Sequence, residues 1–361
     1  MAKRVVIVGA GIIGASLAHS LTRAGAEVVV AERAGPASGA TGKSFGWINS
    51  NLTETKDYHR LRVAGIKAWR DLGEDPGDEP LVRWGGSLSW EDGDAAIDEQ
   101  QAAMRRFGYD ARLVDRDGFS ALEPEVANPP ARCLHCVDEG AVDPARAARA
   151  LLDRAAKAGA ERLIGCEVTG LLRDGERIVG VETTFGPLVA DMVVLAAGAE
   201  SAALAESAGV RLPLTEPVGL LLETAPLRSV LTHIVLTPEI HFRQEPDGRI
   251  IAGEIFSGGG ESADGIDVNP RGLAALILDK LRRRLPGVEG ISAGAVRLGR
   301  RPTPVDGMPI VGDARGAPGL YVAVMHSGVT LGPLIGTLAA AEIVEGATTA
   351  LLAPFRPGRF N

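Results

Sequence analysis

The sequence predicts an α/β protein in which a Rossmann-like domain is interrupted by a second α+β domain with a mixed or antiparallel sheet. Three observations lead to this fold class. A strand, a glycine-rich turn and an amphipathic helix open the chain, in the order of a dinucleotide-binding unit. Short apolar strands followed by glycine recur near residues 190 and 320. The stretches between these segments are rich in hairpin signals, which favours antiparallel sheet.

The N-terminal unit carries a complete dinucleotide fingerprint. The apolar strand Arg4–Val8 leads directly into Gly9, Gly11 and Gly14. The first glycine permits a tight turn, the second lets the backbone approach a pyrophosphate, and the third lets helix and strand pack closely. Glu32 ends the next predicted strand, where an acid accepts hydrogen bonds from a ribose. A glycine-rich turn in an ordinary α/β unit would not explain this acid, so we expect a dinucleotide site.

Apolar residues at helical spacing predict the helices. Gly25 is a natural C-cap for the first helix, Asp143 and Pro144 provide an N-cap and a proline at the first helical position, and Pro286 ends a later helix. The helices are expected at 12–24, 55–72, 94–107, 143–158, 271–285 and 330–345.

Turn residues separate the predicted strands. Asp174-Gly175 and Pro246-Asp247-Gly248 mark two hairpins, and residues 34–51 form a loop rich in glycine and hydroxyl residues. The strands are expected at 81–90, 167–172, 178–183, 188–190, 192–195, 240–244, 249–254, 296–301 and 321–324. The elements divide the chain into a nucleotide-binding domain, 1–80, 135–215 and 296–361, and a second domain, 81–134 and 216–295.

Composition narrows the class of protein. The 361 residues have a net charge of −8, an apolar share of 45% and a charged share of 23%, which is ordinary for a globular protein. The negative charge argues against a nucleic-acid or anionic-membrane surface. No apolar run reaches the roughly 18 residues of a membrane span. The N-terminal residues lack the apolar core and cleavage site of a signal peptide, so we expect a cytoplasmic protein.

The cysteines and histidines do not form a metal-binding pattern. Cys133 and Cys136 flank His135, but a zinc site would need a second ligand pair, and none lies nearby in the sequence. We interpret the two cysteines as small residues in a strand, with a redox pair as the alternative. The other histidines likewise show no metal-ligand spacing, so no metal site is expected; they include His19, His59 and His233.

Motifs spread over nearly the whole chain match one family. They are Val6–Gly14, Ala40–Ser44, Gly140–Pro144, Val193–Ala199, Arg301–Pro309 and Gly319–Pro333. The first motif is common to many folds, whereas the last two together are specific. On these residues the chain resembles the D-amino-acid oxidase-like FAD-dependent oxidoreductases, which include glycine oxidase, sarcosine oxidase, and D-amino-acid and hydroxyproline dehydrogenases.

The resemblance implies an extended FAD. Its pyrophosphate would lie at the helix that starts near Gly11, its ribose at Glu32, and its adenine against the backbone of Val168. Backbone N–H groups at the start of the last helix would stabilise negative charge on the reduced flavin. The residues implied in cofactor binding are Gly9, Gly11, Ile12, Ile13, Gly14, Glu32, Arg33, Thr41, Gly42, Lys43, Ser44, Val168, Ala197, Gly198, Arg301, Gly328, Val329, Thr330 and Leu331.

The resemblance also implies a substrate-binding arginine. Arg301, in the string Gly299–Pro302, occupies the position of an arginine that binds the substrate carboxylate, a role that suits a planar guanidinium. A structural salt bridge or a pyrophosphate contact is the alternative. Arg300 is expected to point the other way along the strand. His241 and His326 are candidate substrate or flavin contacts, with ordinary half-buried histidines as the alternative.

The chain departs from parts of the family pattern. No cysteine lies just upstream of the segment Thr303–Gly307, and no histidine lies at 40–44, the places where relatives attach the flavin, so we expect non-covalent FAD. The strand 249–253 lacks the lysine with which sarcosine-oxidase-like members activate oxygen. Because other oxidases of the family lack that lysine too, oxygen or another acceptor can accept the electrons.

The expected function is oxidation of a C–N bond. A hydride would pass from the α-carbon of an amino acid, or of an N-substituted or cyclic amino acid, to flavin N5 and leave an imine. The alternatives are an amine or biosynthetic intermediate without a simple α-carboxylate, the FAD subunit of a multi-subunit dehydrogenase, and a nicotinamide-dependent dehydrogenase. A small-molecule substrate is expected, and no oligomeric state is predicted.

Overall fold

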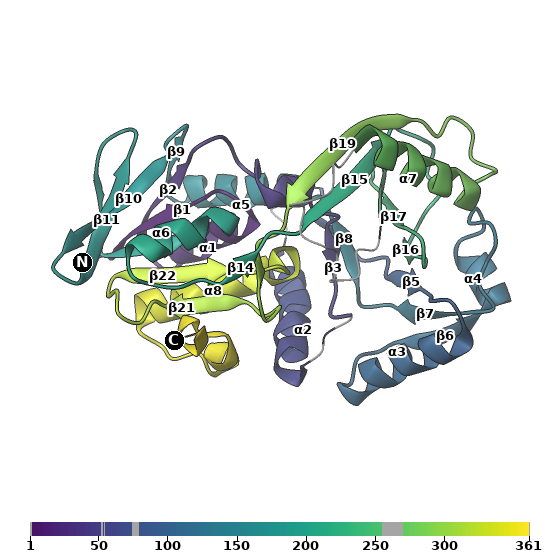
Figure 1. Ribbon diagram of the computed structural model, residues 1–361, viewed down its shortest axis with the longest axis horizontal. Coiled ribbons are helices and arrows are strands. Elements are labelled where there is room, and N and C mark those ends of the chain that lie inside the picture. The colour runs from purple at the N-terminus through teal and green to yellow at the C-terminus, as the bar shows by residue number, and fades with distance from the viewer. Residues whose placement is uncertain (1, 52, 54, 74–78, 255–269, 361) are drawn as a thin grey trace.

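The computed structural model describes residues 2–51, 53, 55–73, 79–254 and 270–360. These residues form two parts, each built around one large sheet (Figure 1). The strands and helices of the two parts alternate along the chain, and one part has a mainly parallel sheet. The predicted α/β fold class, with an interrupting α+β domain, is therefore confirmed, while the domain boundaries given above stay a prediction.

The first part contains a six-stranded sheet with β1 near its centre. The order is β21-β22-β13-β1-β2-β9, and only β21 runs antiparallel to its neighbour. Valine and isoleucine fill its central strands, as expected for a parallel sheet that is buried on both faces. The strands are β1 Arg4–Val8, β2 Glu27–Glu32, β9 Glu161–Ile164, β13 Met192–Leu195, β21 Ile310–Asp313 and β22 Leu320–Val324.

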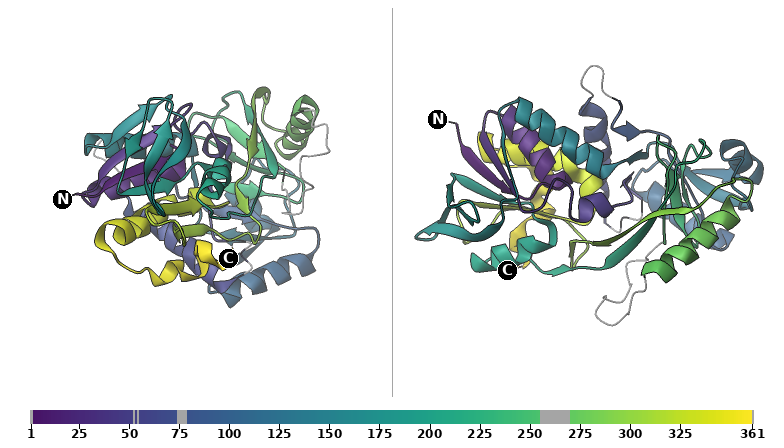
Figure 2. Two further views of the ribbon diagram at one scale, coloured as in Figure 1. Left: turned by 60° about the vertical axis from the view of Figure 1, so that its left-hand side comes forward. Right: turned by 90° about the horizontal axis from the view of Figure 1, so that it is seen from above.

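Both faces of this sheet are covered. Val5 and Ile7 of β1 belong to a core with helices α1 (Ile12–Arg23), α5 (Pro144–Lys157) and α8 (Gly328–Glu345), which lie side by side (Figure 2). Successive strand residues point to opposite faces, so Val6 and Val8 pack against other elements. These elements are β10 Val168–Asp174, β11 Arg177–Thr183, β12 Leu188–Val189 and α6 Ser201–Ser207.

The second part contains an eight-stranded mixed sheet in the order β19-β15-β18-β17-β16-β5-β7-β6, in which only β16 and β5 are parallel. Long strands β15 and β19 connect it to the first part (Figure 1). The strands are β5 Ser87–Ser89, β6 Arg112–Asp115, β7 Arg132–Cys136, β15 Val218–Thr224, β16 Ile234–Leu236, β17 His241–Gln244, β18 Ile250–Gly253 and β19 Ala293–Arg300. The helices are α3 Asp94–Arg106, α4 Arg116–Leu122 and α7 Pro270–Arg284.

Short elements join the two parts. A three-stranded sheet contains β3 Trp47–Ile48, β8 Gly140–Val142 and β4 Val82–Arg83, and β14 Leu214–Thr215 pairs with β20 Thr303–Pro304. The remaining helices are α2 Lys56–Asp71, which Thr55 caps, and the 3-10 turns η1 Ala40–Lys43, η2 Gly198–Glu200, η3 Ala350–Phe355 and η4 Pro357–Phe360.

The single strand predicted at 81–90 is wrong. The chain forms β4 and β5 instead, and each strand joins a different sheet. The break lies at Gly85 and Gly86: Gly86 has φ +80°, and a Cβ on Gly85 would lie 2.5 Å from Thr232 O. Alternating apolar residues continue across this break, so the periodicity alone does not reveal it.

Helix α8 packs unusually close to α1. A Cβ on Gly332 would lie 2.8 Å from Ser16 Oγ, and one on Gly336 would lie 2.8 Å from Ser16 C and closer still to Ser16 O. Helix α8 is long and apolar enough to span a membrane, but in this structure 56% of it is buried. Its apolar composition is explained by its place between α1 and α2 in the core.

Helix α2 supplies a hydrogen-bond donor that α8 lacks. Pro333 lies inside α8 and has no N–H, so the carbonyl of Val329 loses its helical partner. The indole Nε1 of Trp69 donates to that carbonyl at 2.8 Å. A Cβ on Gly65 would lie 2.6 Å from Thr330 O, so α2 also crosses the start of α8 at close range. The start of α8 is therefore held by a neighbour as well as by its own turn.

We predict that Gly336→Ala destabilises the protein by about 2 kcal/mol, because the added methyl group meets the backbone of α1, and overpacking at that scale costs about 1–3 kcal/mol. Urea unfolding followed by circular dichroism measures the change. Gly287→Ala is the control, since its Cβ has no neighbour closer than Glu125 Oε2 at 3.6 Å. Equal unfolding midpoints for both variants would contradict the close contact of α1 and α8.

Candidate active site

The glycine turn after β1 is built by close backbone contacts. Gly9 has φ +103°, and a Cβ there would lie 2.7 Å from Ala196 O. A Cβ on Gly14 would overlap Gly9 O, so only glycine lets α1 start this close to β1. The turn lies at the carboxyl end of the parallel strands, where α/β sheets bind their ligands.

The loop after β2 folds back onto this turn. Ile12 N donates to Thr41 Oγ1 at 3.0 Å, and a Cβ on Gly11 would lie 3.0 Å from the same oxygen. Gly42 N donates to Ala37 O, and Ala37 N donates to Ala10 O. The 3-10 turn η1, which contains Thr41, Gly42 and Lys43, therefore lies directly beside the start of α1.

Glu32 holds the glycine turn through backbone amides. Its carboxylate accepts hydrogen bonds from Ala10 N and Ala34 N, both at 2.9 Å, and from Gly35 N at 3.3 Å. Its carbonyl accepts from Cys166 N at 3.0 Å, which brings the strand of Val168 next to it. Arg33, by contrast, forms an exposed ion pair with Glu200 at 2.6 Å.

Two later segments return to the same edge of the sheet. Ala197 and Gly198 follow β13, and Gly198 has φ +63°. Gly328 begins α8 beside α1, since a Cβ there would lie 3.4 Å from Ile13 Cγ1. Thr330 Oγ1 accepts from Asn49 N at 3.3 Å. Segments from both ends of the chain thus form one glycine-lined cradle, and its close approaches and helix N-termini fit an extended dinucleotide.

Arg301 lies where the second sheet meets this cradle. It follows β19, and its backbone N donates to Pro217 O at 3.0 Å. Its guanidinium lies over Gly219, where a Cβ would be 2.6 Å from Nη2. Burial lowers the pKa of Arg301 from its usual value. Arg300, the neighbour in sequence, is exposed and faces Glu216 at 3.7 Å.

His241 lies on β17 beside Arg301. Its ring contacts Phe45 edge-on, with centroids 4.4 Å apart, and it leans over Gly253, where a Cβ would lie 2.8 Å from Nε2. Burial, followed by the charges of Arg301 and Arg243, lowers the pKa of His241 to about 3. The imidazole is therefore neutral at physiological pH.

His326 lies near Arg301, just before α8. Burial among protein atoms, followed by the charges of Arg301 and Arg62, lowers its pKa to about 4, although its side chain is exposed to water. The site therefore combines one cation with two neutral imidazoles.

Two arginines that the sequence did not single out hold the segments around Arg301 together. Arg243 is 1% exposed; its Nε donates to Phe45 O at 2.6 Å, and its Nη2 donates to Val142 O at 3.1 Å. Arg297 donates to Gly42 O at 2.6 Å. An arginine within a predicted strand was the only sequence signal, because its carbonyl partners lie far away in the sequence.

Arg62 organises the segment that follows β3. It is buried on α2, and it donates to Asn49 O at 3.1 Å, to Asn51 O at 3.0 Å and to Asn49 Oδ1. The loop residues Lys43 and Ser44 lead from η1 to β3. Lys43 packs against Gly299 of β19, and Ser44 Oγ accepts a hydrogen bond from Gly46 N at 3.3 Å. The predicted cofactor loop is thus attached to both sheets.

The cysteine pair and possible metal ligands were the other candidate sites in the sequence. Cys133 and Cys136 are buried and free on β7, and burial raises the pKa of Cys133 to about 12, so the thiol is unreactive. Within the described part of the chain, no group of three or more metal-ligating side chains occurs.

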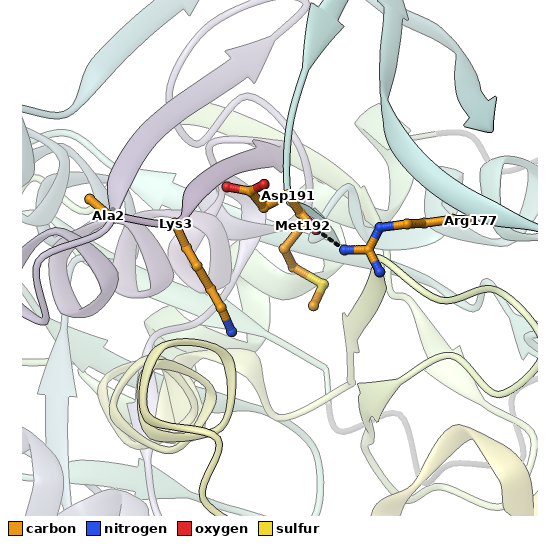
Figure 3. Close-up of a pocket in the computed structure, with 5 residues that line it drawn as sticks. All are labelled: Ala2, Lys3, Arg177, Asp191 and Met192. Carbon is orange, nitrogen blue, oxygen red and sulfur yellow. Dashed lines mark hydrogen bonds between the residues drawn. The ribbon is translucent and has the colours of Figure 1, made fainter.

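A cavity of about 310 Å³ lies away from the cradle (Figure 3). It is lined by Ala2, Lys3, Arg177, Asp191 and Met192, and Arg177 donates to Asp191 O at 3.0 Å. These residues lie at the amino ends of β1, β13 and β11, and β1 and β13 belong to the parallel sheet. Ligands of such sheets bind at the carboxyl ends, so we assign this cavity no role in the reaction.

Comparisons with known proteins agree with this geometry. A family model described as FAD dependent oxidoreductase matches residues 4–342. Glycine oxidase of Pseudomonas aeruginosa is 28% identical over 350 residues, which cover 92% of each chain. Sarcosine oxidase subunit beta of Rhizobium meliloti is 28% identical over 99% of this chain and 88% of its own. The crystal structure of L-proline dehydrogenase from P. horikoshii superimposes with a TM-score of 0.88 at 22% identity, covering 99% of this chain and 98% of that chain.

We predict that Glu32→Ala weakens FAD binding by about 10- to 100-fold, because three backbone amides lose a charged acceptor and the glycine turn loosens. Titration of the apoprotein with FAD, followed by flavin fluorescence, gives the Kd. Glu27→Ala at the exposed start of the same strand is the control, since Glu27 forms only a surface ion pair with Arg4. If Glu32→Ala and the control bind FAD equally well, Glu32 does not support the cradle.

We predict that acid destabilises the wild type more than His241→Gln. The folded pKa of about 3 lies below the unfolded value near 6.5, so the unfolded state binds the proton first, and stability is lost as pH falls through this window. Between pH 6.5 and 5 the difference amounts to at most about 2 kcal/mol. Urea unfolding of both proteins at pH 7.5 and 5 measures it. Parallel losses in the two proteins would show that His241 is not held neutral.

Proposed function

The chain belongs to the family of FAD-dependent oxidoreductases, and on that premise we propose that it oxidises the C–N bond of an amino acid, or of an N-substituted or cyclic amino acid, to the imine. The bound FAD supplies the acceptor for a hydride from the α-carbon. The names of the relatives support this substrate class, because they include a glycine oxidase, a sarcosine oxidase subunit and an L-proline dehydrogenase.

The observation that carries the proposal is the position of Arg301. Its guanidinium lies over Gly219 of β15, and its charge adds to burial in lowering the pKa of both His241 and His326. A partly buried guanidinium binds a carboxylate in two parallel hydrogen bonds and fixes its direction. We assign Arg301 the substrate carboxylate, and we assign His241 and His326 to further contacts with the bound substrate or the flavin.

The electrostatics determine how the substrate amine binds. Arg301 is cationic and both imidazoles are neutral, so these three groups favour an anionic carboxylate and disfavour an ammonium group. The amine therefore binds in its neutral form, with its lone pair free to assist loss of the hydride. The protein contributes chiefly by positioning the α-C–H bond, and it needs no side chain as a strong base.

The cradle is assigned to a non-covalent FAD. The glycine turn and η1 would hold the pyrophosphate, Glu32 the ribose, the Val168 strand the adenine, and residues 328–331 the flavin. No cysteine lies just upstream of Thr303–Gly307, and the segment Ala40–Ser44 contains no histidine. Neither place therefore offers the nucleophile that attaches flavin in relatives.

A second candidate function is that of an FAD-bearing subunit. One observation favours it: the relative named sarcosine oxidase subunit beta matches 99% of this chain. In that case the same Arg301 site would oxidise the substrate, and a partner subunit would help to pass electrons to oxygen or to another acceptor.

We predict that Arg301→Ala raises KM for the carboxylate substrate by about 10- to 100-fold, on the scale of a lost charge-assisted pair. Steady-state kinetics, or anaerobic flavin reduction where turnover is slow, measures the change. Arg300→Ala is the matched control, because the adjacent arginine is exposed and faces Glu216. An unchanged KM in Arg301→Ala would remove the carboxylate clamp from this account.

A further inference from the structure

The buried acid Glu139 lies close to the candidate site and has no part in the reaction proposed above. Glu139, between β7 and β8, is 0% exposed. Its Oε2 accepts hydrogen bonds from Trp47 Nε1 at 2.7 Å and Ser87 Oγ at 2.5 Å, and its Oε1 accepts from Tyr109 OH at 2.6 Å. A buried carboxylate that accepts from three donors holds each of them in a defined direction.

The three donors come from different parts of the chain. Trp47 belongs to β3, Ser87 to β5 of the eight-stranded sheet, and Tyr109 to the segment after α3. Tyr109 OH also accepts from Ser50 N at 3.1 Å, just after β3. One carboxylate therefore fixes β3 relative to the eight-stranded sheet.

Trp47 links this carboxylate to the candidate site. Its side chain packs with Phe45 against a small apolar cluster that contains Ile234 and Leu236, separate from the main core. Leu236 pairs with His241 across β16 and β17, and Phe45 contacts the His241 ring. We call Phe45 and Trp47 the aromatic wall. The wall lies next to one of the three side chains assigned to the substrate.

We propose that Glu139 is a positioning residue: its carboxylate fixes the Trp47 indole, and through it the aromatic wall that borders His241 and selects the substrate side chain. This inference rests on the proposed amino-acid oxidation for its effect on substrate. The orientation of the indole is independent of that function, because it follows from the hydrogen bond alone.

The hydrogen-bonding chemistry of the three donors explains why a carboxylate is needed at position 139. An indole N–H can only donate, so Trp47 needs an acceptor at this position. Burial raises the pKa of Glu139 to about 7, while the hydrogen bonds from Ser87, Tyr109 and Trp47 and the charge of Arg62 oppose that rise. Glutamine has the same size but only one, neutral acceptor oxygen, so it cannot accept from all three donors, and any bond it keeps to the indole is no longer charge-assisted.

The test compares Glu139→Gln, Trp47→Phe and the double variant in the FAD-bound protein. Glu139→Gln should raise KM about tenfold, on the scale of one hydrogen bond to a charged group, for an amino acid with a large apolar side chain, with little change in kcat. Trp47→Phe keeps a ring but removes the donor, so the double variant should be no worse than Glu139→Gln alone. For glycine, which does not reach the wall, all three KM values should stay within about twofold of the wild type.

Glu342→Gln is the matched control. Glu342 is a second buried carboxylate, near the other end of α8, that accepts from Tyr321 OH at 2.8 Å and pairs with Arg356. Its loss should lower the unfolding midpoint without changing KM for either substrate. A difference between wild type and Glu139→Gln in the tryptophan bands of the near-ultraviolet circular dichroism spectrum should disappear in the Trp47→Phe background, which reports on the indole without any turnover.

Unchanged KM values in Glu139→Gln, with active wild-type enzyme, would overturn the proposal. Additive effects of Glu139→Gln and Trp47→Phe would overturn it as well, because they would show that Glu139 does not act through Trp47. If no amino acid reduced the flavin, the proposed function would fail instead, and the circular dichroism difference would still decide whether Glu139 orients the indole.

Discussion

The close contact of backbones around α1 is the constraint on which the rest of the structure depends. Glycine at position 14 lets α1 start against the turn after β1, and glycines 332 and 336 let α8 pack against α1. Any side chain at these positions would push the elements apart. Because they are in contact, the start of α8 and the turn after β1 lie on one edge of the sheet, although about three hundred residues separate them in sequence. The cradle for FAD is a consequence of this packing.

The eight-stranded sheet supplies side chains assigned to the substrate, which the cradle does not contain. Its strands β15, β17 and β19 carry Gly219, His241 and the approach to Arg301, so one face of the sheet presents a cation and a neutral imidazole toward the first part. Buried Arg243 and half-buried Arg297 bind carbonyl groups of the cofactor loop and its continuation, which fixes that face against the loop. Substrate carboxylate and flavin would thus be positioned by the same set of contacts.

Local signals were sufficient to predict much of this arrangement from the sequence. The glycine fingerprint, the turn residues and the helical periodicity predict the α/β fold class and most elements, and the motifs at both ends of the chain identify the family. Interactions between distant residues were not visible. The bond from Trp69 to Val329, the partners of Arg243 and the three donors around Glu139 depend on tertiary structure. The division of residues 81–90 into two strands depends on which sheet each half joins.

Anaerobic reduction of the bound flavin tests the central claim most directly, because it needs neither the natural acceptor nor a partner subunit. The purified protein would be mixed, in the absence of oxygen, with D-amino acids, L-amino acids, secondary amino acids and the corresponding amines without a carboxylate. The account predicts that at least one amino or secondary amino acid bleaches the flavin absorbance, and that its decarboxylated analogue does so far more slowly. Equal bleaching by an amine and its parent amino acid, or bleaching by amines alone, would contradict the assignment of Arg301 to the substrate carboxylate.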